Sequence, residues 1–309
     1  MEPMKQELSD TPAIAIFAFK RADVLSKTLE ALSNARGVNG CDIYVHVDHP
    51  RNESEMKEKL LVLDTIERFR LELNYKKVEI EQNHLGLRNS VISFLSVLAS
   101  SHRYLVVLED DILVAEDFLE YQIECLRRFE FHEGIGSVSG GRFEKFRNLS
   151  GGDLLLSRRH SSWGWGTWGQ VLQSINWEIL DDSKGIAELR QSVAKVGGDL
   201  CNLIDLSLGK KIDSWSIIFD INMIVNKKYC IHPRYQKIQN IGFQSGTHFK
   251  NSVLISRKSA TEIEVKSNQI RDDIPRGLRY DFIIKIKRNS SFIGLLAKFK
   301  NLLLSNKPK

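Results

Sequence analysis

Residues 104–118, YLVVLEDDILVAEDF, combine a strand-like apolar run with a cluster of acidic residues. The run YLVVL contains two valines and predicts a buried strand, and it ends directly in Glu109, Asp110 and Asp111. A helical pattern follows over residues 115–129. A buried strand that leads into a helix is typical of an α/β protein with a mostly parallel sheet and helices on both faces.

The same alternation of strand and helix patterns extends over the first 140 residues. The sequence predicts strands over 13–19, 42–48, 76–82 and 135–140, a helix after the first strand with Leu25, Leu29 and Leu32 on one face, and helices over 53–70 and 88–100. After about residue 142 this pattern breaks, because residues 147–183 hold four of the five tryptophans together with many glycines and serines. Residues 184–209 have a helical pattern that Gly197 and Gly198 interrupt.

The composition is that of a soluble globular protein. The 309 residues are 42% hydrophobic and 27% charged, which excludes a disordered chain, a collagen-like repeat and a disulfide-stapled miniprotein. No apolar run approaches the roughly 18 to 20 residues that span a bilayer. The N-terminus MEPMKQELSD has no secretory pattern, so we expect a cytoplasmic protein. The four cysteines form no CxxC pair, which argues against a thiolate zinc site.

The positive charge of the chain is concentrated at its C-terminal end. Residues 271–309 carry a net charge of +7, whereas the other 270 residues carry −2, so a nucleic-acid partner is not expected. Within 285–309, apolar residues from Phe292 to Leu303 recur at helical spacing among lysines. This pattern predicts a basic amphipathic helix in peripheral contact with an anionic membrane surface, and the alternative is a helix packed on the protein's own core.

The acidic cluster is the first candidate for chemistry. Ligands of open parallel sheets bind at the carboxyl ends of the strands, where Glu109, Asp110 and Asp111 are expected. Adjacent buried carboxylates repel one another, and Mg²⁺ or Mn²⁺ would relieve that cost through oxygen ligands. The alternative interpretation is a solvated acidic turn.

With this segment, four others resemble GT-A fold nucleotide-sugar glycosyltransferases. The resemblance is to the N-acetylglucosaminyltransferase I type and to bacterial family 2-like sugar transferases, and it spans residues 13–249. The other segments are FAFKRADVLSKTLEAL (17–32), YVHVDHP (44–50), QNHLGLRNSV (82–91), and IDSWSIIFD followed by PRYQKIQNIGFQSGTHF (212–249). The resemblance implies one GT-A domain over 1–270, with a nucleotide-binding half at about 12–142 and an acceptor-side half at about 143–270, followed by a basic extension over 271–309.

The resemblance also implies roles for individual residues on the donor side. We expect a nucleotide-diphosphate sugar, with a UDP-sugar favoured, and Mn²⁺ or Mg²⁺ as cofactor. The metal ligands would be Asp111 and the late His248. The residues expected to bind the donor are Phe19 and Arg21 near the base, Asp48 near the uracil or ribose, Arg88 at the diphosphate, and Glu109 and Asp110 at the ribose, the donor sugar or a metal-bound water.

On the acceptor side, Asp213 matches the family's general base, with Asp181 and Asp182 as competing candidates. Here a single Asp213 followed by Ser214 replaces the paired acids that precede tryptophan in the family. The segment SSWGWGTW (161–168) is interpreted as an aromatic shelf for sugars, or alternatively as a tryptophan-rich corner of the core. The acceptor-binding candidates are Gly164, Trp163, Trp165 and Trp215.

The function implied is metal-dependent, inverting transfer of a hexosyl or N-acetylhexosaminyl group to a hydroxyl of a surface polysaccharide or lipid-linked glycan. One alternative is a glycan-binding module that kept the fold without catalysis. The other is a sugar nucleotidyltransferase, which needs a glycine-rich phosphate loop near its first strand. Residues 13–25 contain no glycine, which argues against that alternative.

Overall fold

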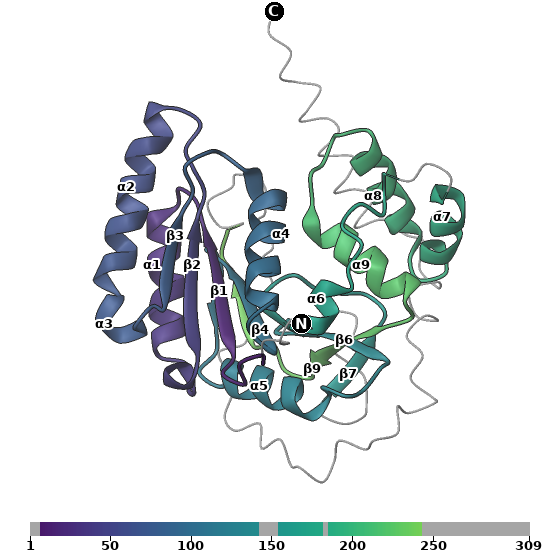
Figure 1. Cartoon of the computed structure of the whole chain (residues 1–309), viewed down its shortest axis with the longest axis horizontal. Helices are drawn as coiled ribbons and strands as arrows, with labels where there is room; N and C mark the ends of the chain where they lie inside the picture. Colours follow the sequence, from purple (N-terminus) through teal and green to yellow (C-terminus); the bar gives the residue numbers. More distant parts are fainter. Residues whose placement is uncertain (1–6, 142–153, 182–184, 243–309) are drawn as a thin grey trace, which may run out of the picture.

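The computed structural model describes residues 7–141, 154–181 and 185–242 (Figure 1). His248, Asp182 and the predicted helix at 285–309 lie outside the described residues, as do residues 142–153. None of the helices in the described part of the chain has both the length and the apolar character needed to cross a membrane.

Within the described residues, an eight-stranded sheet forms the centre of the molecule. From one edge to the other its strands are β3 (Lys77–Ile80), β2 (Asp42–Val47), β1 (Ala13–Ala18), β4 (Tyr104–Glu109), β8 (Trp165–Trp168), β6 (Ile135–Ser139), β9 (Tyr229–Pro233) and β7 (Leu154–Ser157). Strands β3, β2, β1 and β4 are parallel, whereas β8 and β7 run against their neighbours. The predicted α/β class with a mostly parallel sheet is confirmed.

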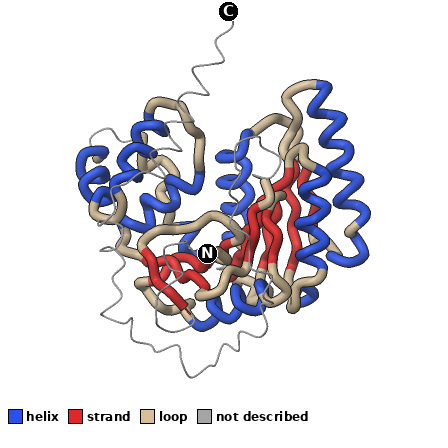
Figure 2. Tube along the Cα trace, turned by 180° about the vertical axis from the view of Figure 1, so that it is seen from behind, coloured by secondary structure: helices blue, strands red, loops and turns tan. Residues whose placement is uncertain are grey.

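Helices cover both faces of the parallel strands. Figure 1 places α1, α2 and α3 on one side of β1–β3 and α4 on the other, and the view from behind in Figure 2 agrees. The helices are α1 (Ala22–Ser33), α2 (Glu53–Arg68), α3 (Arg70–Leu73), α4 (Gly86–Ala99), α5 (Phe118–Arg128), α6 (Gly169–Gln173), α7 (Ile186–Ala194), α8 (Gly198–Leu208) and α9 (Trp215–Val225).

Local sequence explains the parallel half well. All six residues of β1 are buried and apolar, as expected for a strand covered on both faces. Helix α1 turns one apolar stripe, with Leu25, Leu29 and Leu32 fully buried, onto the sheet. Helix α2 begins at an N-cap, since the Asn52 side chain accepts a hydrogen bond from the Glu55 N–H at 3.0 Å.

The helical segment α7–α9 has a hydrophobic cluster of its own, separate from the core under the sheet. Its fully buried members include Val193, Ile204 and Ile221. The predicted helical stretch 184–209 is two helices, and the break between them falls at Gly197, the N-cap residue of α8.

A second, two-stranded sheet brings the end of the described chain back to the acidic cluster. Strand β10 (Ile238–Asn240) pairs antiparallel with β5 (Ile112–Val114), which directly follows that cluster. The Ile241 N–H donates to the Asp111 carbonyl oxygen at 2.9 Å. The segment that leads to His248 therefore begins beside Asp111.

Candidate functional site

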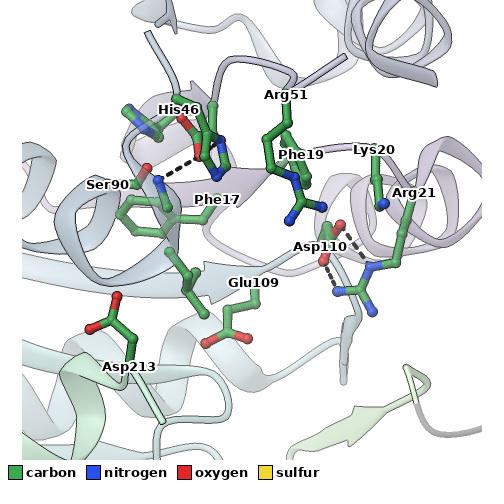
Figure 3. Close-up of a pocket in the computed structure, with 15 residues that line it drawn as sticks. Phe17, Phe19, Lys20, Arg21, His46, Arg51, Ser90, Glu109, Asp110 and Asp213 are labelled. Carbon is green, nitrogen blue, oxygen red and sulfur yellow. Dashed lines mark hydrogen bonds and ion pairs between the residues drawn. The ribbon is translucent and has the colours of Figure 1, made fainter. Parts of the chain in front are cut away.

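A pocket of about 430 Å³ lies at the carboxyl ends of β1, β2 and β4 (Figure 3). Ligands of open α/β sheets bind at this edge. Side chains from the loop before α4 and from the segment before α9 complete it. Its lining is Phe17, Ala18, Phe19, Lys20, Arg21, His46, Asp48, Arg51, His84, Gly86, Leu87, Ser90, Glu109, Asp110 and Asp213. Six of the predicted site residues, Phe19, Arg21, Asp48, Glu109, Asp110 and Asp213, thus lie around one cavity.

The acidic cluster at the end of β4 is bound by one arginine. Arg21 forms a two-point contact with the Asp110 carboxylate, and its Nη1 lies 3.0 Å from Asp111 Oδ2. Burial raises the pKa of Glu109 to about 7, helped by the charges of Asp111 and Asp110 and opposed by Arg21. Burial also raises the pKa of Asp110 to about 6 against the hydrogen bond from Arg21. The cluster therefore carries unfavourable negative charge that Arg21 only partly compensates.

Asp111 is a buried carboxylate that is only partly paired. Its residue is 7% exposed, and its Oδ1 is buried without a hydrogen-bond partner. A Cβ at Gly242 would lie against Asp111 Oδ2, so the chain passes very close to this carboxylate. His248 comes six positions after Gly242, a reach of at most about 20 Å. Among the described residues no group of three potential ligands is arranged around one metal position.

Asp48 binds the loop that precedes α4. Its Oδ1 accepts from the N–H groups of His49 (2.8 Å) and Leu85 (2.9 Å). Its Oδ2 accepts from the Gly86 N–H (3.0 Å) and lies 3.0 Å from His84 Nδ1. The carboxylate therefore fixes residues 84–86 against the end of β2.

Arg88 and Asp213 are in contact. Arg88 Nη1 lies 3.6 Å from Asp213 Oδ1, and Arg88 Nη2 donates to the Trp177 carbonyl oxygen at 3.2 Å. Asp213 is mostly exposed and precedes α9 at the edge of the pocket. The competing base candidate Asp181 is exposed and does not line this pocket.

Sequence analysis missed the basic residues at the mouth of the pocket. Lys20 Nζ and Arg51 Nε each lie 3.0 Å from the Glu55 carboxylate. Both cations also lie over the Phe19 ring, at 5.7 Å for Lys20 and 5.8 Å for Arg51. The signal was available, since Lys20 directly follows the predicted strand 13–19 and Arg51 comes three residues after the predicted strand 42–48.

The expected aromatic shelf is instead part of the core. Trp165 and Trp168 belong to β8, which lies between β4 and β6, so both are buried. Trp215 is 2% exposed and stacks on Trp165 with ring centroids 5.2 Å apart. This burial contradicts an open sugar-binding face on Trp165 or Trp215, and neither ring lines the pocket. Trp163 is 39% exposed and also lies outside the pocket lining.

Gly164 has a packing role as well. Its φ is +53°, and a Cβ there would lie 2.8 Å from Ile238 Cγ2 and 3.3 Å from Ile112 Cγ2. The glycine is therefore required by its own backbone conformation and by its close neighbours. Nothing about it points to an approaching sugar.

No protein-family model matches the sequence, and no curated protein matches it. The chain is similar to the solved structure of S. aureus TarS 1-349, with 9% identity and a TM-score of 0.44, over 74% of this chain and 59% of that one. It is similar to the mannosyltransferase PcManGT from Pyrobaculum calidifontis in complex with GDP-Man and Mn²⁺, with 11% identity and a TM-score of 0.41, over 55% and 50%.

A further similarity is to 4-diphosphocytidyl-2C-methyl-D-erythritol synthase from Anaerococcus prevotii, with 9% identity and a TM-score of 0.40, over 74% of this chain and 92% of that one. The chain spans 59% or less of the TarS and mannosyltransferase chains named above. Similarities of this size do not distinguish a sugar transferase from a nucleotidyltransferase.

Proposed function

We propose that this protein transfers a hexosyl or N-acetylhexosaminyl group from a nucleotide-diphosphate sugar to a hydroxyl of a glycan. The donor is favoured to be a UDP-sugar, and the acceptor is a surface polysaccharide or a lipid-linked glycan. The observation that supports this most is one pocket that combines the carboxylates at the end of β4 with Asp213 from the segment before α9.

Asp213 is proposed as the general base of an inverting transfer. Its carboxylate accepts the proton of the acceptor hydroxyl as that oxygen forms its bond to the anomeric carbon. The bond between that carbon and the diphosphate oxygen breaks, and the nucleoside diphosphate leaves with the electron pair. The 64% exposure of the Asp213 side chain supports this role, because an acceptor can reach it from solvent.

Arg88 is proposed to bind the diphosphate of the donor, since a guanidinium matches phosphate geometry. Its Nε is buried without a hydrogen-bond partner among the described residues. Phe19 and the cations beside it would border the same ligand at the mouth of the pocket.

Asp111 and His248 are proposed to hold Mn²⁺ or Mg²⁺, with Asp110 beside them at the ribose or a metal-bound water. The buried, unpartnered Asp111 Oδ1 fits a ligand of a hard cation. When bound, the cation neutralises charge on the leaving diphosphate. Asp111→Ala should then remove metal-dependent donor binding while leaving the fold intact.

The proposed function is tested by incubating the protein with single nucleotide sugars, Mn²⁺ and glycan acceptors, and measuring the nucleoside diphosphate released. Asp213→Asn should lower the rate at least about 100-fold at unchanged donor affinity, the lower end of general-base contributions. Asp181→Asn is the matched control and should keep the rate. Pyrophosphate release from a nucleoside triphosphate and a sugar 1-phosphate, without transfer, would instead identify a nucleotidyltransferase.

For the segment 285–309 we propose contact with an anionic membrane surface, which would bring the pocket to a lipid-linked acceptor. Its alternation of lysines and apolar residues supports this. Co-sedimentation with vesicles tests it. The full chain should bind vesicles that contain anionic lipid at low salt and lose that binding at high salt. Failure to bind these vesicles even at low salt would contradict the proposed membrane contact.

A further inference from the structure

The pocket contains two buried polar side chains that have no hydrogen-bond partner among the described residues. His46, on β2, is 1% exposed, and neither of its ring nitrogens has a hydrogen-bond partner. Ser90, on α4, is 3% exposed, and its Oγ also has none. Both line the pocket, and Figure 3 shows them with Phe17 at the far end of the lining from Arg21 and Asp110. Buried polar groups in folded proteins are nearly always paired, so this end of the pocket is built for a polar ligand.

Ser90 differs from the other serines of the same helix. The hydroxyls of Ser93 and Ser96 each donate to the carbonyl oxygen four residues earlier, both at 2.7 Å. This is the usual bond for serine inside a helix. The Ser90 hydroxyl does not make it, although a helical carbonyl is available at Gly86. Its hydrogen-bonding capacity is therefore left for a group in the pocket.

Asp48 cannot supply recognition at this end. A carboxylate has about four lone-pair sites. The Asp48 carboxylate accepts from the His49, Leu85 and Gly86 N–H groups, and His84 Nδ1 lies at 3.0 Å. Three backbone N–H groups thus occupy the carboxylate, and the ring of His84, whose Nδ1 also lies 2.8 Å from the His49 carbonyl oxygen, lies against Oδ2. The nucleotide contact that the resemblance implies for Asp48 therefore has to come from other residues.

The unpaired polar atoms of His46 and Ser90 indicate which hydrogen-bonding groups a ligand would need to match them. His46 packs against Phe17 and Phe94, with ring centroids at 5.6 and 5.0 Å, and of these two aromatic rings Phe17 also lines the pocket. Burial lowers the pKa of His46, so its imidazole is neutral and has one donor and one acceptor. Nδ1 lies 3.7 Å from Glu81 Oε1. A proton on Nδ1, beside that carboxylate, leaves Nε2 as an acceptor.

We propose that His46 and Ser90 select the base of the bound nucleotide by recognising a lactam edge, in which a ring N–H lies next to a carbonyl. His46 Nε2 accepts from the ring N–H, and the Ser90 hydroxyl donates to the carbonyl. Uracil and guanine have this edge, whereas cytosine and adenine present an acceptor nitrogen next to an amino group. The inference rests on the proposed function in that the ligand is a nucleotide.

Calorimetric titration of the full chain with UDP, CDP, GDP and ADP in the presence of Mn²⁺ tests the proposal. Each comparison is matched in size, UDP with CDP and GDP with ADP. The wild-type protein should bind the lactam member of at least one pair at least about tenfold more tightly, because a site built for such a group leaves its polar atoms unpaired with the wrong base. Equal affinity within both pairs would overturn the inference.

Two substitutions assign the selectivity to these residues. Ser90→Ala and His46→Phe should each reduce the affinity ratio within the preferred pair by about tenfold. Ser93→Ala, on the same helix, should leave the ratio unchanged. Ser90→Ala should also leave the melting temperature of the ligand-free protein unchanged or raised, because it removes an unpaired buried hydroxyl. If His46→Phe does not fold, Ser90→Ala alone decides the test.

The outcomes separate the inference from the proposed function. Binding of nucleoside diphosphates with an unchanged ratio in both variants would overturn the inference and leave the transferase proposal standing. Absence of binding for all four diphosphates would overturn both. Asp48→Asn should weaken all four by the same factor, since it loosens the loop before α4, and a selective loss in that variant would return base recognition to Asp48.

Discussion

The guanidinium of Arg88 lies 3.6 Å from the carboxylate of Asp213. Arg88 is on α4, in the parallel half of the molecule. Asp213 lies two residues before the start of α9. From the sequence, Arg88 was expected at the donor diphosphate and Asp213 was expected to be the general base, with no link between them. In the folded chain they are neighbours, so a diphosphate bound at Arg88 would also lie beside the proposed base.

This contact leads to a prediction for Arg88→Gln. The pair is partly exposed, so its loss should cost less than about 1 kcal/mol of folding stability. The Kd for UDP should rise about tenfold or more, since charge-assisted hydrogen bonds to phosphate are lost. The Kd for uridine, which has no phosphate, is the control measurement and should not change. Equal weakening of UDP and uridine would contradict a diphosphate role.

The position of Arg21 predicts competition with a divalent cation. Arg21 contacts Asp111, the proposed metal ligand, and its neighbour Asp110. Arg21→Gln should lower the free energy of unfolding of the metal-free protein by about 1–3 kcal/mol, because buried carboxylates lose a partner. Its affinity for Mn²⁺ without nucleotide, measured from the spin-resonance signal of free Mn²⁺, should rise.

Arg51→Gln provides the control for that measurement. Arg51 is also a cation at the pocket, but it contacts Glu55 and not the acidic cluster. Its removal should leave Mn²⁺ affinity unchanged. A fall in Mn²⁺ affinity in Arg21→Gln would show that Arg21 supports the metal site, contrary to the prediction.

Gly164→Ala should destabilise the fold by about 2 kcal/mol or more, since it adds a positive-φ cost to a steric clash. Its Cβ would lie 2.8 Å from Ile238 Cγ2. Gly37→Ala is the matched control, because Gly37 has a φ of +91° and open space around it. That variant should lose only about 1 kcal/mol. Chemical denaturation measures both, and equal losses would remove the packing explanation for Gly164.

His160 predicts a loss of stability in acid. Burial and the charge of His232 lower the pKa of His160 to about 3. The unfolded chain binds the proton near pH 6.5, so the contribution is present above that pH and is lost as the pH falls towards 3. Between pH 7 and pH 4 the free energy of unfolding should therefore fall by about 3 kcal/mol, at 1.36 kcal/mol per pKa unit.

The measurement for this prediction is the free energy of unfolding as a function of pH in the wild type and in His160→Asn. The variant should show a slope smaller by about one proton between pH 6 and pH 4. The comparison isolates His160 from nearby buried groups, which include Asp220, Arg159 and His232. Parallel curves would contradict the buried neutral state of His160.

Sequence patterns predicted the parallel half because its strands are apolar and its helices amphipathic. Strands β1, β2 and β4 lie within one or two residues of the predicted ranges. The order of these units also placed the acidic cluster at the ligand-binding edge of the sheet. These features depend on local periodicity, which a sequence states directly.

What the sequence left open depends on contacts between distant segments. The WGTW segment is a strand because β4 and β6 pair with both of its edges, and nothing local distinguishes it from a loop. The hydrogen bonds that Asp48 accepts were equally hidden, since two of their donors are the distant N–H groups of Leu85 and Gly86. His46 and Ser90 were missed because an unpaired polar atom is visible only when all its neighbours are known.

The central claim is that the acidic cluster holds a cation that binds a nucleotide-sugar donor. A thermal-shift screen of nucleotide sugars, with and without Mn²⁺, tests it most directly, since a ligand of the folded state raises the melting temperature by mass action. The account predicts a rise with at least one nucleotide sugar that needs Mn²⁺ and disappears in Asp111→Ala. A rise of the same size without metal, or one that persists in Asp111→Ala, would contradict the account.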